Sequence, residues 1–257
     1  MRPVLNYYPL AEGVTAFSTT RHGGVSCGDY GELNINPYCG DSLEAVIDNR
    51  RLLAAELSVD EQRLVLPHQV HGTDCYMVTE QLFSLSETAR CNRLQVDSLI
   101  TDCKHTCIGV STADCIPVLL YDPEHHAAAA VHAGWRGTVE GGVRKTVDEM
   151  RERYGSKPPL LRCVIGPGIS LERFEVGEEV YETFAQHGFD MTQIARKMDK
   201  WHIDLPLCNK MQLLQAGVGE EHILMTGICT FDNVADYFSA RRLGQQSGRI
   251  YTGIILR

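Results

Sequence analysis

The sequence IGVSTADCIPVLLYDPEHHAAAAVHAGWRGT, residues 108–138, contains two apolar segments joined by a turn. Cys115 directly precedes IPVLLY and His132 directly follows AAAAV, so each polar side chain lies at the end of a segment with the composition of a buried strand. The Asp-Pro pair between them is typical of a turn. We therefore predict neighbouring strands that bring thiol and imidazole together. These two residues alone are equally compatible with a metal-binding pair and with a buried cysteine beside a hydrogen-bonded histidine.

Length and composition indicate a folded, water-soluble protein. The chain has 257 residues, of which 44% are hydrophobic and 22% charged, so it can bury a large core. The formal net charge of −9 argues against a general nucleic-acid surface, whereas a small anionic substrate stays possible if a few arginines converge. The N-terminus lacks a secretory pattern and no segment approaches the roughly 20 apolar residues of a membrane span, so we expect a cytoplasmic protein. In that compartment the ten cysteines are expected to be reduced.

The order of predicted elements indicates a single α/β domain over residues 1–257 with helices outside central sheets. Strands are predicted at 14–20, 64–78 with an interruption, 94–102, 160–169, 222–228 and 249–257, and helices at 41–57, 141–155, 176–188 and 204–217. No internal repeat or linker is evident.

Two local features carry specific predictions. His68 and His71 lie in a segment that reads as extended, so their side chains are expected on opposite sides, with only one facing any given pocket. Thr138 could cap the helix that follows, which would direct free backbone N–H groups toward residues 135–137 and favour an anion there.

Common nucleotide and hydrolase motifs are absent. The chain has no GxxxxGK[ST], no GxGxxG after a strand, no HxE with PCxxC and no GxSxG. It also has no HxH pair, so the several histidine-rich copper sites of a true multicopper laccase are not expected. What remains is the set His71, Cys115 and His132, whose two imidazoles and thiolate suit a zinc ion with one position open for water or substrate.

The chain resembles the polyphenol oxidase or laccase-domain family of multifunctional purine nucleoside phosphorylases, the YfiH type, along almost its whole length. The segments that carry the resemblance are HQVHG at 68–72, TADCIPVLLYD at 112–122, HAGWRGT at 132–138, IGPGI at 165–169, FEVG at 174–177, FSARR at 238–242 and SGR at 247–249. Many relatives have cysteine in the GPC loop where this chain has Gly168, so that position cannot supply an essential ligand here.

The resemblance implies a four-layer α/β/β/α sandwich with His71, Cys115 and His132 as zinc ligands. It also implies phosphorolysis of adenosine, inosine, guanosine and methylthioadenosine, and deamination of adenosine, with nucleoside and phosphate as small-molecule partners. We add Arg21, Gln69 and Arg136 as candidates that orient phosphate or nucleoside, although each could equally brace a loop.

Three other functions stay open at this point. Cys115 could be the nucleophile of an amide hydrolase or deamidase, with His132 or His71 as base. The protein could also be a non-catalytic zinc-bearing binding protein with a closed coordination sphere. A copper-dependent phenol oxidase activity is suggested by the family's older name, because copper binds tightly to such donor sets.

Overall fold

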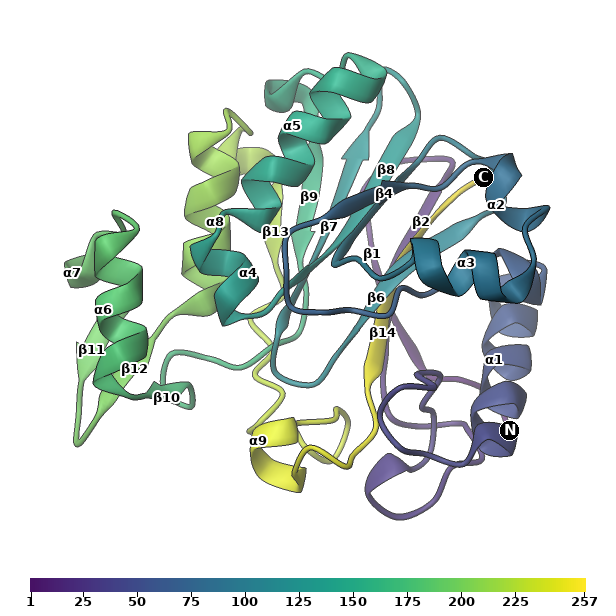
Figure 1. Ribbon diagram of the computed structural model, residues 1–257, viewed down its shortest axis with the longest axis horizontal. Helices are drawn as coiled ribbons and strands as arrows, with labels where there is room; N and C mark the ends of the chain where they lie inside the picture. Colours follow the sequence, from purple (N-terminus) through teal and green to yellow (C-terminus); the bar gives the residue numbers. More distant parts are fainter.

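Two β-sheets pack face to face at the centre of the protein (Figure 1). The computed structural model describes all residues, 1–257. The five-stranded sheet has the order β1 (Leu5–Tyr8), β2 (Val14–Thr19), β14 (Ile250–Leu256), β6 (Cys107–Thr112), β3 (Leu64–Val65). The six-stranded sheet has the order β13 (Ile223–Met225), β9 (Arg162–Ile165), β7 (Ile116–Asp122), β8 (Ala127–Ala133), β5 (Ser98–Thr101), β4 (Cys75–Met77).

Helices cover the outer faces of the sheets, and a small third sheet lies to one side. The helices are α1 (Leu43–Leu57), α2 (Glu80–Phe83), α3 (Glu87–Arg93), α4 (Trp135–Val139), α5 (Gly142–Tyr154), α6 (Glu178–Gln186), α7 (Met191–Ile194), α8 (Leu205–Gln215) and α9 (Ala240–Leu243). The third sheet joins β10 (Glu175–Val176), β12 (Trp201–Ile203) and β11 (Ala195–Lys197), and it lies beside α6 and α7, away from α1 (Figure 1). No helix is both long and apolar enough to cross a membrane.

The strand pair predicted from the central sequence is present. β7 and β8 are antiparallel neighbours, with Pro117 opposite His132 and Asp122 opposite Ala127. β6 and β7 follow one another in the chain but belong to different sheets. The chain therefore crosses from one sheet to the other over residues 113–115, and Cys115 lies at this crossing.

Both faces of β7 are buried, which explains why its sequence is a continuous apolar run. Leu119 and Tyr121 point toward the five-stranded sheet and share a core with Val110 of β6. Val118 and Leu120 point the other way, into a core with α5 and α8. This alternation follows from the two-residue period of a strand.

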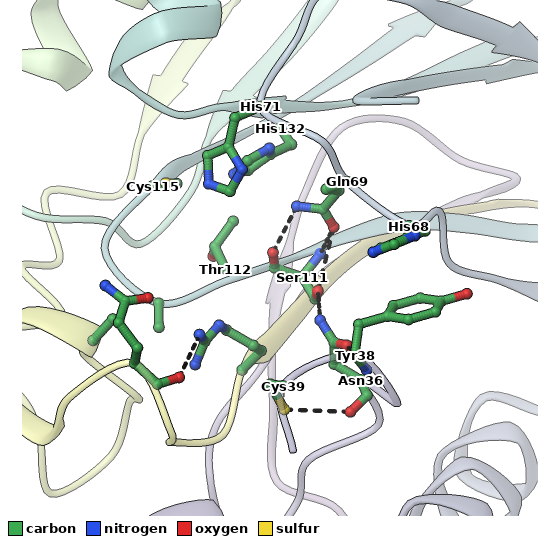
Figure 2. A pocket seen from close by; sticks show the side chains of 14 residues that line it. Asn36, Tyr38, Cys39, His68, Gln69, His71, Ser111, Thr112, Cys115 and His132 are labelled. Atoms are coloured by element: carbon green, nitrogen blue, oxygen red, sulfur yellow. Dashed lines mark hydrogen bonds between the residues drawn. The ribbon is translucent and has the colours of Figure 1, made fainter. Parts of the chain in front are cut away.

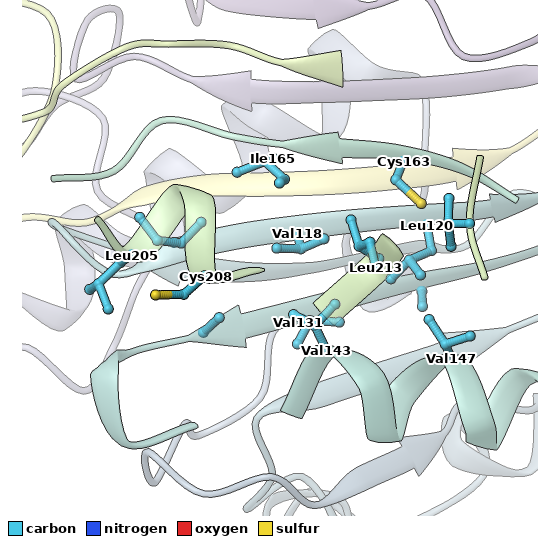
Figure 3. Close-up of a cluster of buried hydrophobic side chains, with 14 of the residues drawn as sticks. Val118, Leu120, Val131, Val143, Val147, Cys163, Ile165, Leu205, Cys208 and Leu213 are labelled. Atoms are coloured by element: carbon cyan, nitrogen blue, oxygen red, sulfur yellow. The ribbon is translucent and has the colours of Figure 1, made fainter. Parts of the chain in front are cut away.

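The outer cores join each sheet to its helices. Figure 3 shows Val118 and Val131 of the six-stranded sheet packed with Val143 and Val147 of α5 and with Leu213 of α8. On the other side of the protein, residues of α1 pack with Phe17, Tyr251 and Ile255 of the five-stranded sheet. The predicted mixed α/β fold class is therefore confirmed.

Two local predictions were wrong. The predicted interruption between β3 and β4 is present, but His68 and His71 do not alternate as in an extended strand, because His71 adopts a left-handed φ of 62°. Thr138 does not cap α5, since it lies inside α4, and the N-cap of α5 is Gly141 with a φ of 76°. Residues 135–137 are thus the first turn of their own short helix and not an anion site in front of α5.

Truncating a side chain between the two sheets should destabilise the fold strongly. Leu119 is fully buried there, so Leu119→Ala removes apolar contacts and leaves a cavity. We expect a loss of about 2–5 kcal/mol in the free energy of unfolding, measured by urea denaturation. The control is Leu43→Ala, because Leu43 is 65% exposed. Equal losses in the two variants would contradict the assignment of this inter-sheet core.

Candidate metal centre

His71, Cys115 and His132 meet at one end of a cavity. One ligand atom from each side chain lies within 4.8 Å of the corresponding atoms of the other two. The two imidazole rings are edge to face, with centroids 4.8 Å apart and planes at 82°. Figure 2 shows the three side chains grouped together, with Asn36, Tyr38 and Cys39 around the other end of the cavity.

The crossing between the sheets fixes the position of Cys115. The preceding residue, Asp114, has a φ of 87°, which is unusual for a residue other than glycine. Its carboxylate accepts hydrogen bonds from Thr230 Oγ1 and from the backbone N–H of Arg241, both at 2.7 Å. These bonds hold a strained turn in place, and the turn aims the Cys115 thiol toward the histidines.

A buried carboxylate, Asp97, organises both histidines. His132 Nδ1 lies 2.8 Å from Asp97 Oδ1, and the backbone N–H of His71 donates to the same oxygen at 2.9 Å. Asp97 Oδ2 accepts from the N–H of Gly72 at 2.7 Å and of Val70 at 3.3 Å. These hydrogen bonds offset the energetic cost of the left-handed backbone conformation of His71. Because Asp97 occupies Nδ1 of His132, Nε2 is the ring nitrogen available to a metal.

The charges of the cluster favour a thiolate. Burial alone would raise the pKa of Cys115, but the charge and hydrogen bond of His132, with those of His71, lower it well below the usual thiol value. Burial would likewise lower the pKa of His132, yet Cys115 and Asp97 raise it. Burial opposes ionisation of Asp97, but His132 and the amides of Gly72 and His71 keep the pKa of Asp97 low.

The residues present fit one metal ion. Two imidazoles and a thiolate are a common zinc donor set. Bonds of about 2.0–2.3 Å require ligand atoms about 3.5 Å apart. Because the three ligand atoms already lie within 4.8 Å of one another, small side-chain rotations bring them to one ion. Gly134 keeps this space open. A Cβ at Gly134 would lie 3.2 Å from both Cys115 Sγ and His71 Cδ2.

The cavity beside the cluster has a volume of about 240 Å³ and is mainly polar at its walls. Its lining comprises Asn36, Tyr38, Cys39, His68, Gln69, His71, Ser111, Thr112, Ala113, Cys115, His132, Ala240, Gln245 and Arg249. His68 and His71 thus line the same cavity, contrary to the prediction that only one of them would. The ring of His68 stacks on Tyr38, with centroids 4.2 Å apart.

Of the three residues predicted to orient substrate, only Gln69 lines the cavity. Its amide pairs with Ser111 in both directions, donating to the carbonyl and accepting from the N–H, each at 2.8 Å. Arg21 donates to the carbonyls of Gly31 at 2.8 Å and Val234 at 2.9 Å, outside the cavity wall.

Arg136 is also absent from the cavity wall. It is exposed on α4, with its guanidinium carbon 4.4 Å from the ring centroid of Trp135. The structure therefore places Arg136 beside a tryptophan and not among the residues that line the cavity.

Sequence reasoning missed most of the residues around this site, and Asp97, Arg249 and Thr112 are three of them. Asp97 is the one acidic residue of the segment LQVDSLI, and a carboxylate next to the buried strand β5 was a signal of a buried partner. Arg249 belongs to the SGR segment and lines the cavity, but its distance along the chain from the histidines gave no sign of this position. Thr112 lines the cavity, and its hydroxyl is buried with no hydrogen-bond partner.

A family model described as multi-copper polyphenol oxidoreductase laccase matches residues 15–257. The chain belongs to this family. A purine nucleoside phosphorylase of Bacteroides thetaiotaomicron is 44% identical over 98% of this chain and 96% of that protein. Adenosine deaminase RL5, from an unknown prokaryotic organism, is 39% identical over 97% of each chain. The crystal structure of YlmD from Geobacillus stearothermophilus has a TM-score of 0.89 and 32% identity, covering 97% of this chain and 94% of that one.

The family resemblance stated from the motifs is therefore confirmed. The family description refers to several coppers. In this structure the histidine, cysteine and acidic side chains form one group that could hold a metal ion, namely His71, Cys115 and His132.

Removing the charge of Asp97 should weaken metal binding. In Asp97→Asn an amide group would face donors that now meet a carboxylate, so His132 and His71 would lose their orientation. We expect metal affinity to fall about 10- to 100-fold, measured by competition with a chromogenic chelator. Asp74→Asn is the matched control, because that side chain is exposed. Unchanged affinity in Asp97→Asn would show that the carboxylate does not orient the ligands.

A methyl group at position 134 should interfere with the cluster directly. The φ of Gly134 is −67°, which alanine adopts without strain, so any effect of Gly134→Ala comes from the crowded contacts with Cys115 and His71. We expect a loss of metal affinity of about tenfold with little change in the melting temperature of the metal-free protein. The reverse pattern, a lower melting temperature with full affinity, would contradict this interpretation.

Proposed function

We propose that this protein is a zinc-dependent purine nucleoside enzyme. The observation that carries the proposal is the convergence of His71, Cys115 and His132 at the wall of an open cavity, in a chain whose relatives are named purine nucleoside phosphorylase and adenosine deaminase. The proposed reactions are phosphorolysis of adenosine, inosine, guanosine and methylthioadenosine, and hydrolytic deamination of adenosine.

The three ligands would hold the ion, and zinc is the metal that we propose for this donor set. Copper is the alternative, because it binds tightly to imidazole and thiolate. When bound, the metal would supply a Lewis acid at the end of the cavity, where it would activate an oxygen of water or substrate.

The chain's own residues have separate tasks in this proposal. Asp97 fixes the tautomer and direction of His132, and Asp114 fixes the turn that presents Cys115. Asn36 donates to Ser111 Oγ at 2.6 Å and Ser111 pairs with Gln69, so one hydrogen-bonded chain shapes the cavity wall. Gln69 would position the nucleoside through this wall. For Arg21 we propose a supporting role in its loop, through the carbonyls of Gly31 and Val234, and for Arg136 a supporting role on α4, against Trp135.

The two reactions act on different substrate atoms. Phosphorolysis breaks the bond between ribose C1′ and purine N9, joins a phosphate oxygen to C1′ and leaves the base with a proton on nitrogen. Deamination adds water at purine C6 and releases ammonia. One cavity can perform both only if the nucleoside binds in two orientations, with either C1′ or C6 near the cluster.

A second candidate function is supported by one observation. Cys115, His132 and Asp97 follow one another as thiol, imidazole and carboxylate, which is the order of a nucleophile, its base and the group that orients the base. The alternative proposal is an amide hydrolase or deamidase in which Cys115 attacks a carbonyl carbon.

Product analysis separates these proposals. Purified protein of measured metal content is incubated with adenosine, inosine, guanosine or methylthioadenosine, with and without phosphate, and the products are separated by chromatography. We expect phosphate-dependent release of free base, or inosine from adenosine, and no turnover in Cys115→Ala. Cys27→Ala is the control, because Cys27 is an exposed thiol outside the cavity.

Chelation then distinguishes the two chemistries. Nucleoside turnover that is lost on chelation and restored by zinc supports the metal-dependent proposal. Restoration by copper and not by zinc would identify copper as the metal. Amide hydrolysis that survives chelation but is lost on alkylation of Cys115 supports the alternative. No nucleoside turnover at one metal ion per chain would overturn the proposed function.

A further inference from the structure

The cavity beside the metal cluster has no carboxylate and one permanent cation in its lining, although the protein as a whole is acidic. The chain carries a formal net charge of −9, yet none of the 14 lining residues is aspartate or glutamate. Arg249 is the one arginine or lysine among them. A cation in a concave site without carboxylates attracts and retains small anions.

The guanidinium of Arg249 is held by carbonyls of its own loop, but some of its N–H groups have no hydrogen-bond partner. Nη1 donates to the carbonyls of Ser247 at 2.6 Å and Gly248 at 3.0 Å, and Nη2 donates to the carbonyl of Gln245 at 3.0 Å. A guanidinium has five N–H groups. The N–H of Nε and one N–H of Nη2 therefore have no protein partner, which leaves two donors for a ligand.

The surrounding backbone keeps this arginine in place. Ser247 and Gly248 are buried, and the N–H of Gly248 donates to the carbonyl of Asp29 at 3.0 Å. A Cβ at Gly248 would lie within 2.8 Å of the ring of Phe238, so only glycine fits there. Arg249 directly precedes β14, a central strand, so its backbone is anchored at the start of the five-stranded sheet's middle strand.

A second donor in the same cavity lacks a partner. The hydroxyl of Thr112 is buried without a hydrogen bond, although buried polar groups are nearly always paired. In Figure 2 Thr112 lies between Ser111 and the group of His71, Cys115 and His132. The hydroxyl is covered by its neighbours, so the wall would have to shift slightly before an anion in the cavity could accept from it.

We propose that Arg249 forms a subsite for inorganic phosphate in the same cavity as the metal cluster. The proposal rests on the proposed phosphorolysis, and it assigns phosphate to a different arginine from Arg21 and Arg136. The two free N–H groups of the guanidinium can bind two oxygens of phosphate, and such paired bonds fix the orientation of the anion. A remaining phosphate oxygen then forms the bond to ribose C1′ as the bond from C1′ to N9 breaks.

Steady-state kinetics with inosine test this subsite. In Arg249→Met both donors and the charge are lost, so KM for phosphate should rise about tenfold or more while KM for inosine changes much less. Arg249→Lys keeps the charge without the paired geometry and should give an intermediate KM for phosphate. Arg242→Met is the matched control, because Arg242 also donates to a backbone carbonyl, that of Phe231, but does not line the cavity.

A binding measurement keeps the inference separate from the proposed reaction. Phosphate binding should raise the melting temperature of the wild-type protein and of Arg242→Met, but not that of Arg249→Met. If Arg249→Met does not fold, as judged by circular dichroism, Arg249→Lys takes its place in both measurements.

The outcomes distinguish two failures. If the wild-type protein turns over no nucleoside but phosphate stabilises it through Arg249, the proposed function fails and the anion subsite stands. If phosphorolysis occurs and both the KM for phosphate and the phosphate-dependent stabilisation are unchanged in the Arg249 variants, the subsite is overturned. A rise confined to the KM for inosine would also overturn it, since Arg249 would then serve the nucleoside.

Discussion

The buried carboxylate of Asp97 is the interaction on which the metal centre depends. It joins β5 at its N-terminal end to the irregular segment of residues 70–72 and to the ring of His132 on β8. An uncompensated carboxylate in this position would be very unfavourable, but four donors surround it. The same bonds that satisfy its charge also hold the backbone of His71 in a left-handed conformation. Stability and ligand geometry therefore have a common origin at this residue.

The second constraint is the passage of the chain between the two sheets. β6 ends in one sheet and β7 begins in the other, and residues 113–115 must turn sharply within this short distance. Asp114 adopts a positive φ to do so and is held by Thr230 and Arg241, which are more than a hundred residues away in sequence. The thiol of Cys115 is thereby fixed at the edge where the sheets meet, next to the cavity.

The polar chemistry of the cavity comes from segments that the fold brings together from both ends of the chain. Asn36, Ser111 and Gln69 form one hydrogen-bonded wall, and Arg249 closes the cavity from the loop before β14. In this arrangement the apolar cores of the sheets carry the stability, while the cavity at their rim is free to hold polar and charged groups. This separation of apolar cores from a polar cavity is typical of proteins in which a packed framework supports functional loops.

The sequence alone determined the features that depend on local patterns. The apolar run after Cys115 and the alanine run before His132 predicted β7 and β8, and the Asp-Ser pair before α1 predicted its start, where Ser42 accepts from Ala45 N–H. The residue pattern and then the family resemblance proposed the three residues that the fold gathers into one cluster. The role of Asp97, the left-handed backbone of His71 and the position of Arg249 at the cavity wall, away from which Arg21 and Arg136 lie, depended on tertiary structure. The physical reason is that charge compensation, backbone strain and access to a cavity arise from contacts between distant segments, which no local pattern in the sequence records.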